Sequence, residues 1–387
     1  MMRLLLILPI IFYTHLLKAE NENPFDEAES RLLEIIDFQR NGAIDEALQR
    51  AEILLEEYPN FKLGKFVYSE LLTAKAQSKN FINKVDQSNE KLALLKKEAS
   101  ARLNFKSEYK NNNLIPKSII NISKKSDYLL IVELSKSRLY LVKNDNPPRV
   151  VNDFYVSIGK EGYSKFASGD NKTPTGIYTV KTFYHDNDLP ELYGNGAFPI
   201  NYPNSWDKRN NKTGYGIWIH GVPRDTYSRP PLASEGCVVT SNKTLLKLKE
   251  FIHLGETKII LTEEINWVTK KEWKENNAFF QNVIQNWKMS WESLDPYKYI
   301  AQHSVDFKSK QHDFEKRVSH ILRITKDKEF IDLKLRDINI FFYPNKKDLV
   351  FYEFKQDYKS NNFSSTTRKG LFWKKEEDVW RIIHEGS

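Results

Sequence analysis

The sequence GIWIHGVPRDTYSRPPLASEGCVVTSN, residues 216–242, holds the features around which the rest of the chain is organised. His220 ends one apolar run and Cys237 begins another, so each lies where an expected strand meets a loop. Cys237 is the only cysteine in 387 residues, and no disulfide can therefore form within the chain. A cysteine preceded by glycine, with a histidine upstream, has the pattern of a nucleophile with its base and nearby backbone donors. The pattern predicts a catalytic pair, whereas an inert core cysteine would need neither neighbour.

Length and composition indicate a soluble globular protein of two or three domains. Charged residues make up 28% of the chain and hydrophobic residues 40%. The lysines are scattered, without a basic helix or zinc-finger spacing, which argues against a nucleic-acid partner. The formal charge of +8 indicates a solvated basic surface, or one that favours an anionic polymer such as the cell wall.

The first residues have the pattern of a secretory signal peptide, expected over residues 1–19. Arg3 precedes an apolar run from Leu4 to Tyr13, and Ala19 supplies a small residue at the expected cleavage site. The run is too short for a comfortable membrane span, although an uncleaved anchor is the alternative. We therefore expect a mature protein in the periplasm or secreted to the cell envelope, without a stable membrane span once the signal is removed.

Residues 20–113 are expected to be helical, and residues 114–126 to be a linker. The segment NGAIDEALQRAEILLEEYPNF, residues 41–61, resembles a tetratricopeptide-type helical hairpin. A single unit of this kind cannot bury its own apolar face. Two interpretations stay open: the region forms a homodimer or recruits a protein partner, or it is a spacer that docks on its neighbours.

From residue 127 onward, the helical spacing of apolar residues gives way to runs typical of strands. Apolar, β-branched runs at 128–134 and 138–143 predict a hairpin, and a helix capped by Ser241 is expected among the later strands. Residues 127–262 therefore predict a mostly-β domain. Residues 263–387 begin with a tryptophan-rich helical stretch, with helical signals as far as Ser319, and end in four alternating runs, which predicts a connecting helix and an α+β domain.

Several motifs in order resemble the L,D-transpeptidase catalytic family of bacterial cell-wall enzymes. They are Gly159-Lys160, the turn GDNKTPTG at 169–176, the Ile219-His220-Gly221 triplet, and Ser234-Glu235-Gly236-Cys237, whose cysteine lies 17 residues after the histidine. The C-terminal region resembles the NTF2-like domain. The whole order of domains is similar to that of cell-shape L,D-carboxypeptidases of helical bacteria.

The resemblance implies chemistry on peptidoglycan stem peptides. No ligand spacing for zinc stands out in the sequence, so we expect no metal, and we expect no cofactor. Cys237 would attack the carbonyl between an L-configured centre and a terminal D-alanine, and His220 would act as general base and then as acid. The backbone N–H groups of Gly236 and Cys237 would form the oxyanion hole. The residues expected to contact substrate are Ser234, Glu235, Gly221, Arg224 and Arg229.

Two departures from the family pattern leave the acyl acceptor open. Glu235 stands where many members have histidine, and Val239 stands where members often have arginine. If that arginine binds a substrate carboxylate, then Arg224, Arg229 or Lys165 must replace it here. An amine acceptor would make the enzyme a transpeptidase, and water would make it a carboxypeptidase that trims tetrapeptide to tripeptide stems. A third possibility is a catalytically silent cell-wall scaffold.

Overall fold

The computed structural model describes residues 26–77, 90–109 and 113–386. The chain forms two compact units, Met1–Val85 and Asp86–Ser387, each described here by itself. Among the described residues, no helix has the length and apolar character needed to cross a membrane. The expected signal peptide at residues 1–19 lies outside the described residues and stays a prediction.

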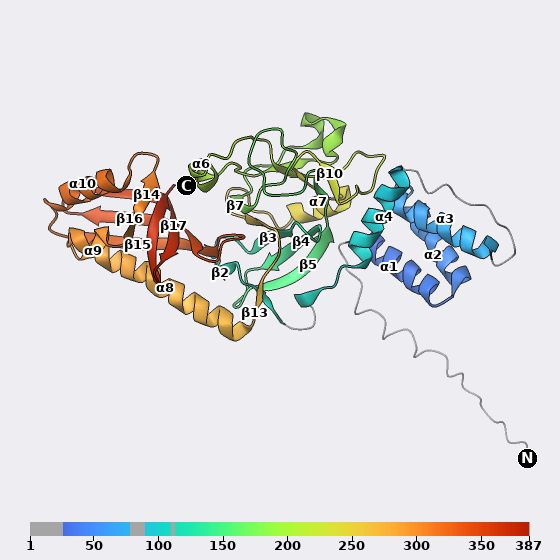
Figure 1. Ribbon diagram of the computed structural model, residues 1–387, viewed down its shortest axis with the longest axis horizontal. Coiled ribbons are helices and arrows are strands. Elements are labelled where there is room, and N and C mark those ends of the chain that lie inside the picture. Colours follow the sequence, from blue (N-terminus) through green and yellow to red (C-terminus); the bar gives the residue numbers. More distant parts are fainter. Residues whose placement is uncertain (1–25, 78–89, 110–112, 387) are drawn as a thin grey trace, which may run out of the picture. The chain divides into compact units, whose positions relative to one another are not determined.

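The first unit contains α1 (Glu27–Arg40), α2 (Ile44–Glu57) and α3 (Lys62–Gln77), drawn in blue in Figure 1. Asp26 caps α1 by accepting a hydrogen bond from the Glu29 amide at 3.2 Å. Gly42, at φ +78°, permits the turn between α1 and α2 that the Asn-Gly pair predicts. Leu54 of α2 and Phe61 are fully buried. The neighbouring helices therefore cover the apolar face of the expected hairpin within this unit.

The second unit begins with α4 (Glu90–Leu103) and continues into the β-rich domain. The central sheet of that domain has the order β5-β4-β3-β12-β7, in which β3 and β12 are parallel and the other pairs antiparallel. The strands are β3 (Tyr128–Glu133), β4 (Arg138–Lys143), β5 (Arg149–Tyr155), β7 (Gly176–Thr179) and β12 (Lys258–Thr262). All five residues of β12 are buried, because the sheet is covered on both faces.

Two smaller sheets beside the central one carry the predicted site. One has the order β11-β9-β8, and the other pairs β10 with β6 in parallel. Their strands are β6 (Ile158–Gly159), β8 (Ala197–Pro199), β9 (Trp218–His220), β10 (Leu232–Ser234) and β11 (Val238–Val239). Short helical turns η1 (Asp186–Asp188) and η2 (Glu191–Tyr193), with α6 (Ser205–Arg209) and α7 (Asn242–Lys249), complete this part. Ser241 caps α7 by accepting from the Thr244 amide at 3.1 Å, as the sequence predicts.

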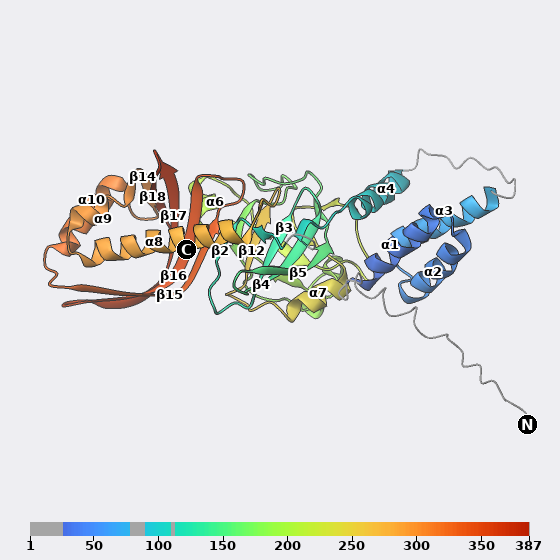
Figure 2. The same cartoon turned by 90° about the horizontal axis from the view of Figure 1, so that it is seen from below.

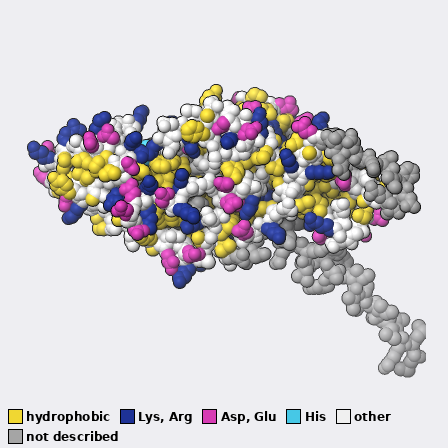
Figure 3. All heavy atoms as spheres, viewed as in Figure 1, with side chains coloured by type: hydrophobic (Ala, Val, Ile, Leu, Met, Phe, Trp, Pro, Cys, Tyr) yellow, Lys and Arg dark blue, Asp and Glu magenta, His cyan; other side chains and the backbone are white. Residues whose placement is uncertain are grey.

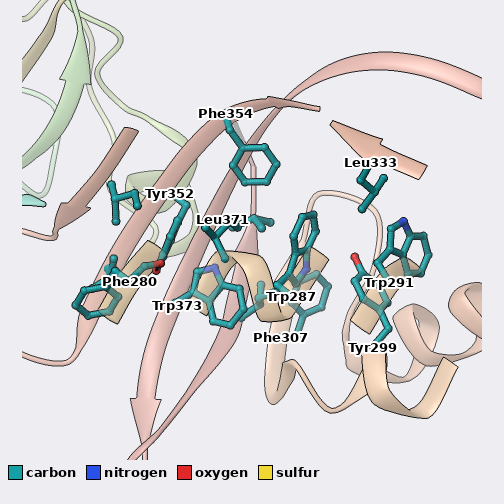
Figure 4. Packing of buried hydrophobic residues seen from close by; sticks show 14 of the residues in the cluster. Phe280, Trp287, Trp291, Tyr299, Phe307, Leu333, Tyr352, Phe354, Leu371 and Trp373 are labelled. Carbon is teal, nitrogen blue, oxygen red and sulfur yellow. Dashed lines mark hydrogen bonds between the residues drawn. The ribbon is translucent and has the colours of Figure 1, made fainter. Parts of the chain in front are cut away.

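The C-terminal domain packs helices against one face of a six-stranded sheet with the order β14-β18-β17-β16-β15-β2. Figures 1 and 2 show the long helix α8 lying along this sheet. In its aromatic core, Trp287 of α8 packs against Phe354 of the sheet, with ring centroids 5.6 Å apart, and Trp291 packs against Tyr299 (Figure 4). The elements are α8 (Lys270–Glu292), α9 (Pro296–Ile300), β14 (His303–Ser309), α10 (Phe314–Thr325), β15 (Ile331–Phe342), β16 (Leu349–Ser360), β17 (Ser364–Glu376) and β18 (Val379–Glu385).

Two parts of the chain differ from expectation. Residues 303–309, expected to be helical, form the edge strand β14. The expected linker 114–126 contains β1 (Ile115–Pro116), paired with β13 (Trp267–Val268), and β2 (Ile119–Asn121), paired with β15. Ile119 and Ile120 are fully buried there. The segment is built into the C-terminal sheet because its isoleucines fill the junction between the two domains.

On the face shown in Figure 3, Lys and Arg side chains are interspersed with Asp and Glu. This face lacks the continuous basic stripe that a nucleic-acid backbone would require.

Candidate active site

His220 and Cys237 are brought together by neighbouring parallel strands. In the β9–β11 pair, Ile219 lies opposite Val238 and His220 opposite Val239. Cys237 comes directly before β11, two residues from Val239, and side chains two apart along a strand point to the same face. The register therefore directs the thiol and the imidazole to one face of this small sheet.

The imidazole of His220 is buried and held in one tautomer. Its Nδ1 lies 2.7 Å from the Gly221 carbonyl oxygen, which can only accept, so Nδ1 carries the proton and Nε2 is the basic atom. The ring of Tyr193 packs edge-on against it, with centroids 4.9 Å apart. Burial lowers the pKa of His220 to about 4, against the effect of the Gly221 hydrogen bond, and the Arg229 charge lowers it further. The residue is therefore a neutral base at physiological pH.

Cys237 is half-buried, and its thiol donates to the Gly216 carbonyl at 3.4 Å. Burial raises the pKa of the thiol to about 11. The Trp218 amide and the Arg229 charge oppose this increase, while the Glu235 carboxylate adds to it. The resting pair is thus a neutral thiol beside a neutral imidazole, and the nucleophile forms only when a base removes the proton.

The Ser-Glu-Gly-Cys turn is fixed by its own hydrogen bonds. Ser234 Oγ donates to the Cys237 carbonyl at 2.6 Å and accepts from the Gly236 amide at 3.1 Å. A Cβ on Gly236, at φ +123°, would lie 2.8 Å from the Lys172 carbonyl oxygen, so only glycine fits. The Gly236 amide and the Ser234 hydroxyl are therefore both engaged within the turn in the substrate-free protein. The expected contact of Ser234 with substrate stays a prediction, as does the oxyanion role of the Gly236 amide, and the Cys237 amide is the oxyanion donor we use below.

Gly221 is required where the chain leaves β9. Asn242 Oδ1 accepts from the amides of Asn195 and Val222 at 3.0 and 3.2 Å, and its Nδ2 donates to the Val222 carbonyl at 2.8 Å. A Cβ on Gly221 would come within 2.0 Å of that oxygen. Gly221 thus fits the backbone against Asn242, and its expected contact with substrate stays a prediction.

The Gly-Asp and Thr-Pro turn supports β6 and does not supply a free cation. Lys165, whose side chain is almost fully buried, pairs with Asp170 at 2.6 Å. Burial alone would raise the pKa of Asp170, but Lys165 and the amides of Phe166 and Ala167 lower it to about 2. Thr173 Oγ1 accepts from the Gly159 amide at 2.9 Å. Lys165 is thus committed to this turn, and its charge also lowers the pKa of Cys237. Its expected role in place of the family's arginine stays a prediction.

Of the two loop arginines, Arg229 is the one directed at the catalytic pair. Arg224 is 69% exposed and pairs with Asp186 at 3.1 Å. Arg229 is half-buried, and its guanidinium donates to the Leu192 carbonyl at 3.2 Å. Burial lowers the pKa of Arg229, and the charge of a Cys237 thiolate opposes that effect. Its own charge acts on both Cys237 and His220.

Sequence reasoning missed Tyr193. Its ring contacts those of Trp218 and His220, and burial raises the pKa of its hydroxyl, with the charges of Cys237 and Glu235 adding to the effect. No local pattern marks this tyrosine, which lies in η2, well before His220 in the chain. Glu235, within the Ser-Glu-Gly-Cys turn, is exposed, and its expected contact with substrate stays a prediction.

Three aromatic residues that precede His220 in the chain have different surroundings. Tyr202 is buried and donates to the Thr213 carbonyl at 2.9 Å, and Trp206 stacks on Phe372 of the C-terminal sheet at 5.0 Å. Tyr215 is 85% exposed. In the part of the chain that the structure describes, no group of three or more His, Cys, Asp or Glu residues is placed to hold a metal ion.

Comparisons with known proteins agree with this geometry. The sequence model of the L,D-transpeptidase catalytic domain matches residues 127–261, and that of the Cds6 C-terminal NTF2-like domain matches residues 279–386. The structure of Bd1075 from Bdellovibrio bacteriovorus is 30% identical over 70% of this chain and 97% of that one, with a TM-score of 0.62. The chain belongs to the L,D-transpeptidase family.

A second solved structure is also similar to this L,D-transpeptidase-family chain over both domains. The helical cell shape determining protein Pgp2 from Campylobacter jejuni is 25% identical over 72% of this chain and 96% of that one, with a TM-score of 0.59. No curated protein sequence matches the chain. The predicted fold classes, an L,D-transpeptidase-like catalytic domain followed by an NTF2-like domain, are confirmed. The protein is an enzyme of the peptidoglycan L,D-transpeptidase family, a transferase or a hydrolase of the cell envelope.

Proposed function

We propose that the enzyme cleaves the bond between the L-configured centre and the terminal D-alanine of tetrapeptide stems, through a thioester on Cys237, and passes the acyl group to an amine. The observation that carries the proposal is the β9–β11 register, which places Cys237 and a tautomerically fixed His220 on one face. The family match supports the peptide chemistry.

Each step follows from the neutral resting pair. His220 Nε2 takes the thiol proton as Sγ bonds to the carbonyl carbon, and the Cys237 amide stabilises the oxyanion. The carbon–nitrogen bond then breaks, and the imidazolium returns the proton to the departing D-alanine amine. An acceptor amine next gives its proton to His220 and attacks the thioester, and the released sulfur regains the proton. Arg229, whose charge acts on Cys237, would bind the terminal carboxylate of the stem peptide.

Water is the second candidate acceptor, which would make the enzyme an L,D-carboxypeptidase. Two observations favour it: the likeness to a helical cell shape determining protein extends over both domains, and Val239 replaces the usual arginine. Incubation with disaccharide-tetrapeptide, followed by mass spectrometry, separates the two. Cross-linked dimers would establish transfer, and tripeptide with free D-alanine as the sole products would overturn it. If neither cross-linked dimers nor tripeptide forms, the result would favour the catalytically silent scaffold.

Cys237→Ala is the control for both outcomes, because it removes the sulfur and leaves the turn hydrogen bonds of Ser234 in place.

We further propose that residues 1–19 direct export to the periplasm. N-terminal sequencing of the mature protein from the periplasmic fraction tests this, and a chain that retains Met1 there would contradict cleavage.

A further inference from the structure

The helix α4 precedes the residues that the catalytic family model matches, yet it buries two charges against the catalytic domain. Glu98 and Arg102 lie one turn apart, and their side chains are 2% and 1% exposed. Buried charges on a short helix are costly unless they have a specific partner. Their partners therefore indicate what the helix does.

Both charged side chains are connected by contacts to the loop between His220 and Cys237. Glu98 Oε1 accepts from Arg102 Nη2 at 2.9 Å, and also from the hydroxyl of Ser228 at 2.6 Å. The Arg102 guanidinium lies 3.8 Å from the centroid of the Tyr155 ring, whose hydroxyl donates to the Arg229 carbonyl at 2.9 Å. Two successive loop residues, Ser228 and Arg229, are thus held from α4, one directly and one through Tyr155.

The far end of Arg229 reaches the catalytic pair. Its guanidinium donates to the Leu192 carbonyl, next to Tyr193, whose ring contacts His220. A loop arginine normally samples many rotamers and loses most of its electrostatic effect to solvent. Fixing the backbone at residues 228 and 229 removes part of that freedom, so the cation stays at the Leu192 carbonyl, from where its charge acts on the thiol.

We propose that α4 is a positioning element of the active site, in which the Glu98–Arg102 pair fixes Ser228 and Arg229 so that the Arg229 guanidinium faces Cys237 and receives the stem-peptide carboxylate. The carboxylate role rests on the proposed function, whereas the positioning of the cation beside the thiol does not. Glu98, Arg102 and Ser228 are positioning residues, because they act through Arg229 and not on the reacting atoms.

A reagent pair that differs only in charge measures this positioning without turnover. Iodoacetate carries a carboxylate and iodoacetamide is neutral, and both alkylate Cys237, the only thiol in the chain. The ratio of their rates isolates the effect of the nearby cation, because thiol ionisation and access affect both reagents. We expect Arg229→Ala to lower the iodoacetate-to-iodoacetamide ratio about fivefold.

The informative variant is Ser228→Ala, which removes one hydroxyl and its bond to Glu98. We expect it to lower the same ratio about twofold to threefold, and Glu98→Gln to do so less, since it keeps the accepting oxygen. Ser100→Ala is the matched control on the exposed face of α4, where the hydroxyl accepts from Asn104, and it should leave the ratio unchanged. In an Arg229→Ala background, Ser228→Ala should have no further effect.

The outcomes separate the two proposals. A ratio that Ser228→Ala leaves at the wild-type value would overturn the positioning role of α4, and a ratio insensitive to Arg229→Ala would overturn it as well. If the ratios change as expected but no tetrapeptide is converted, the proposed function fails while the positioning role stands. With tetrapeptide as substrate, Ser228→Ala should raise KM severalfold with kcat nearly unchanged. A fall in kcat accompanied by a lower melting temperature would instead indicate that the variant is partly unfolded.

Discussion

Cys237 and His220 are both uncharged near neutral pH, because burial raises the pKa of the thiol to about 11 and lowers that of the imidazole to about 4. The thiolate fraction of the free protein should therefore rise about tenfold per pH unit until the pH approaches 11. Rates of iodoacetamide modification measured from pH 6 to 10 should show no plateau. A plateau below about pH 8 would instead indicate a preformed thiolate–imidazolium pair.

The loss of the base should be separable from the loss of fold. Replacement of His220 by glutamine removes the atom that accepts the thiol proton, so we expect release of D-alanine to fall by about 10² or more. His253→Gln is the matched control, because His253 is a second histidine of the same domain and lies exposed after α7. Equal losses in the two variants would contradict the assignment of His220.

At the scale of elements, the packing between the end of β9 and the start of α7 has no spare volume. An alanine at position 221 would push a methyl group against Asn242 Oδ1, which holds two amides of neighbouring loops. We expect Gly221→Ala to destabilise the fold by about 1–3 kcal/mol, measured by chemical denaturation, and to abolish activity. The double variant Gly221→Ala/Asn242→Ala should be less destabilised than the two single changes added together, and strict additivity would refute the clash.

The positions of site residues could be predicted from sequence where a local motif contains them. Contacts between segments far apart in the chain could not be predicted. The His220 and Cys237 positions follow from glycine-flanked motifs at strand ends, and β3 and β4 follow from apolar runs around a turn. The contact from Glu98 to Ser228 spans 130 residues, so no window of sequence contains it. The strand β14 was mistaken for helix because edge strands expose polar residues and lose the apolar alternation. The hydrogen bond from the Gly236 amide to Ser234 was not predictable either, because a motif does not show which amide is already bonded.

At the scale of the molecule, a buried ion pair joins the catalytic domain to the C-terminal sheet. Lys258 of β12 and Glu353 of β16 approach to 2.6 Å, with side chains that are 3% and 10% exposed. Burial lowers the pKa of Lys258, and Glu353 opposes that shift. Lys258→Met leaves the carboxylate buried without its charge partner, so we expect a loss of about 3–5 kcal/mol in unfolding free energy.

Adding Glu353→Gln to the Lys258→Met variant removes the stranded charge. We expect the double variant to recover most of the lost stability, measured by denaturant unfolding of the whole chain. A double variant as unstable as the single one would show that the pair contributes packing alone.

The whole protein should lose stability as the pH falls from about 6.5 toward 3. Burial lowers the pKa of His303 to about 3, as it lowers that of His220 to about 4, so the unfolded chain binds more protons in this range. Burial alone would raise the pKa of Glu385, but Lys369 and Arg317 lower it to about 2, which adds to the loss below pH 4.5. Denaturation midpoints that stay constant between pH 7 and 4 would contradict these shifts.

The strand β2 has a consequence for the genetics of this protein. A nonsense allele that ends the chain after the catalytic domain would also remove β15 and Trp273, which bind the backbone of Ile119 upstream of that domain. Its phenotype would combine loss of the C-terminal domain with damage to the enzyme, and the two effects would be inseparable. Missense alleles that replace residues on the exposed face of α8, such as Met289, change the C-terminal domain while leaving the contacts of β15 and Trp273 with Ile119 intact. They are the alleles from which a separate role for this domain can be learned.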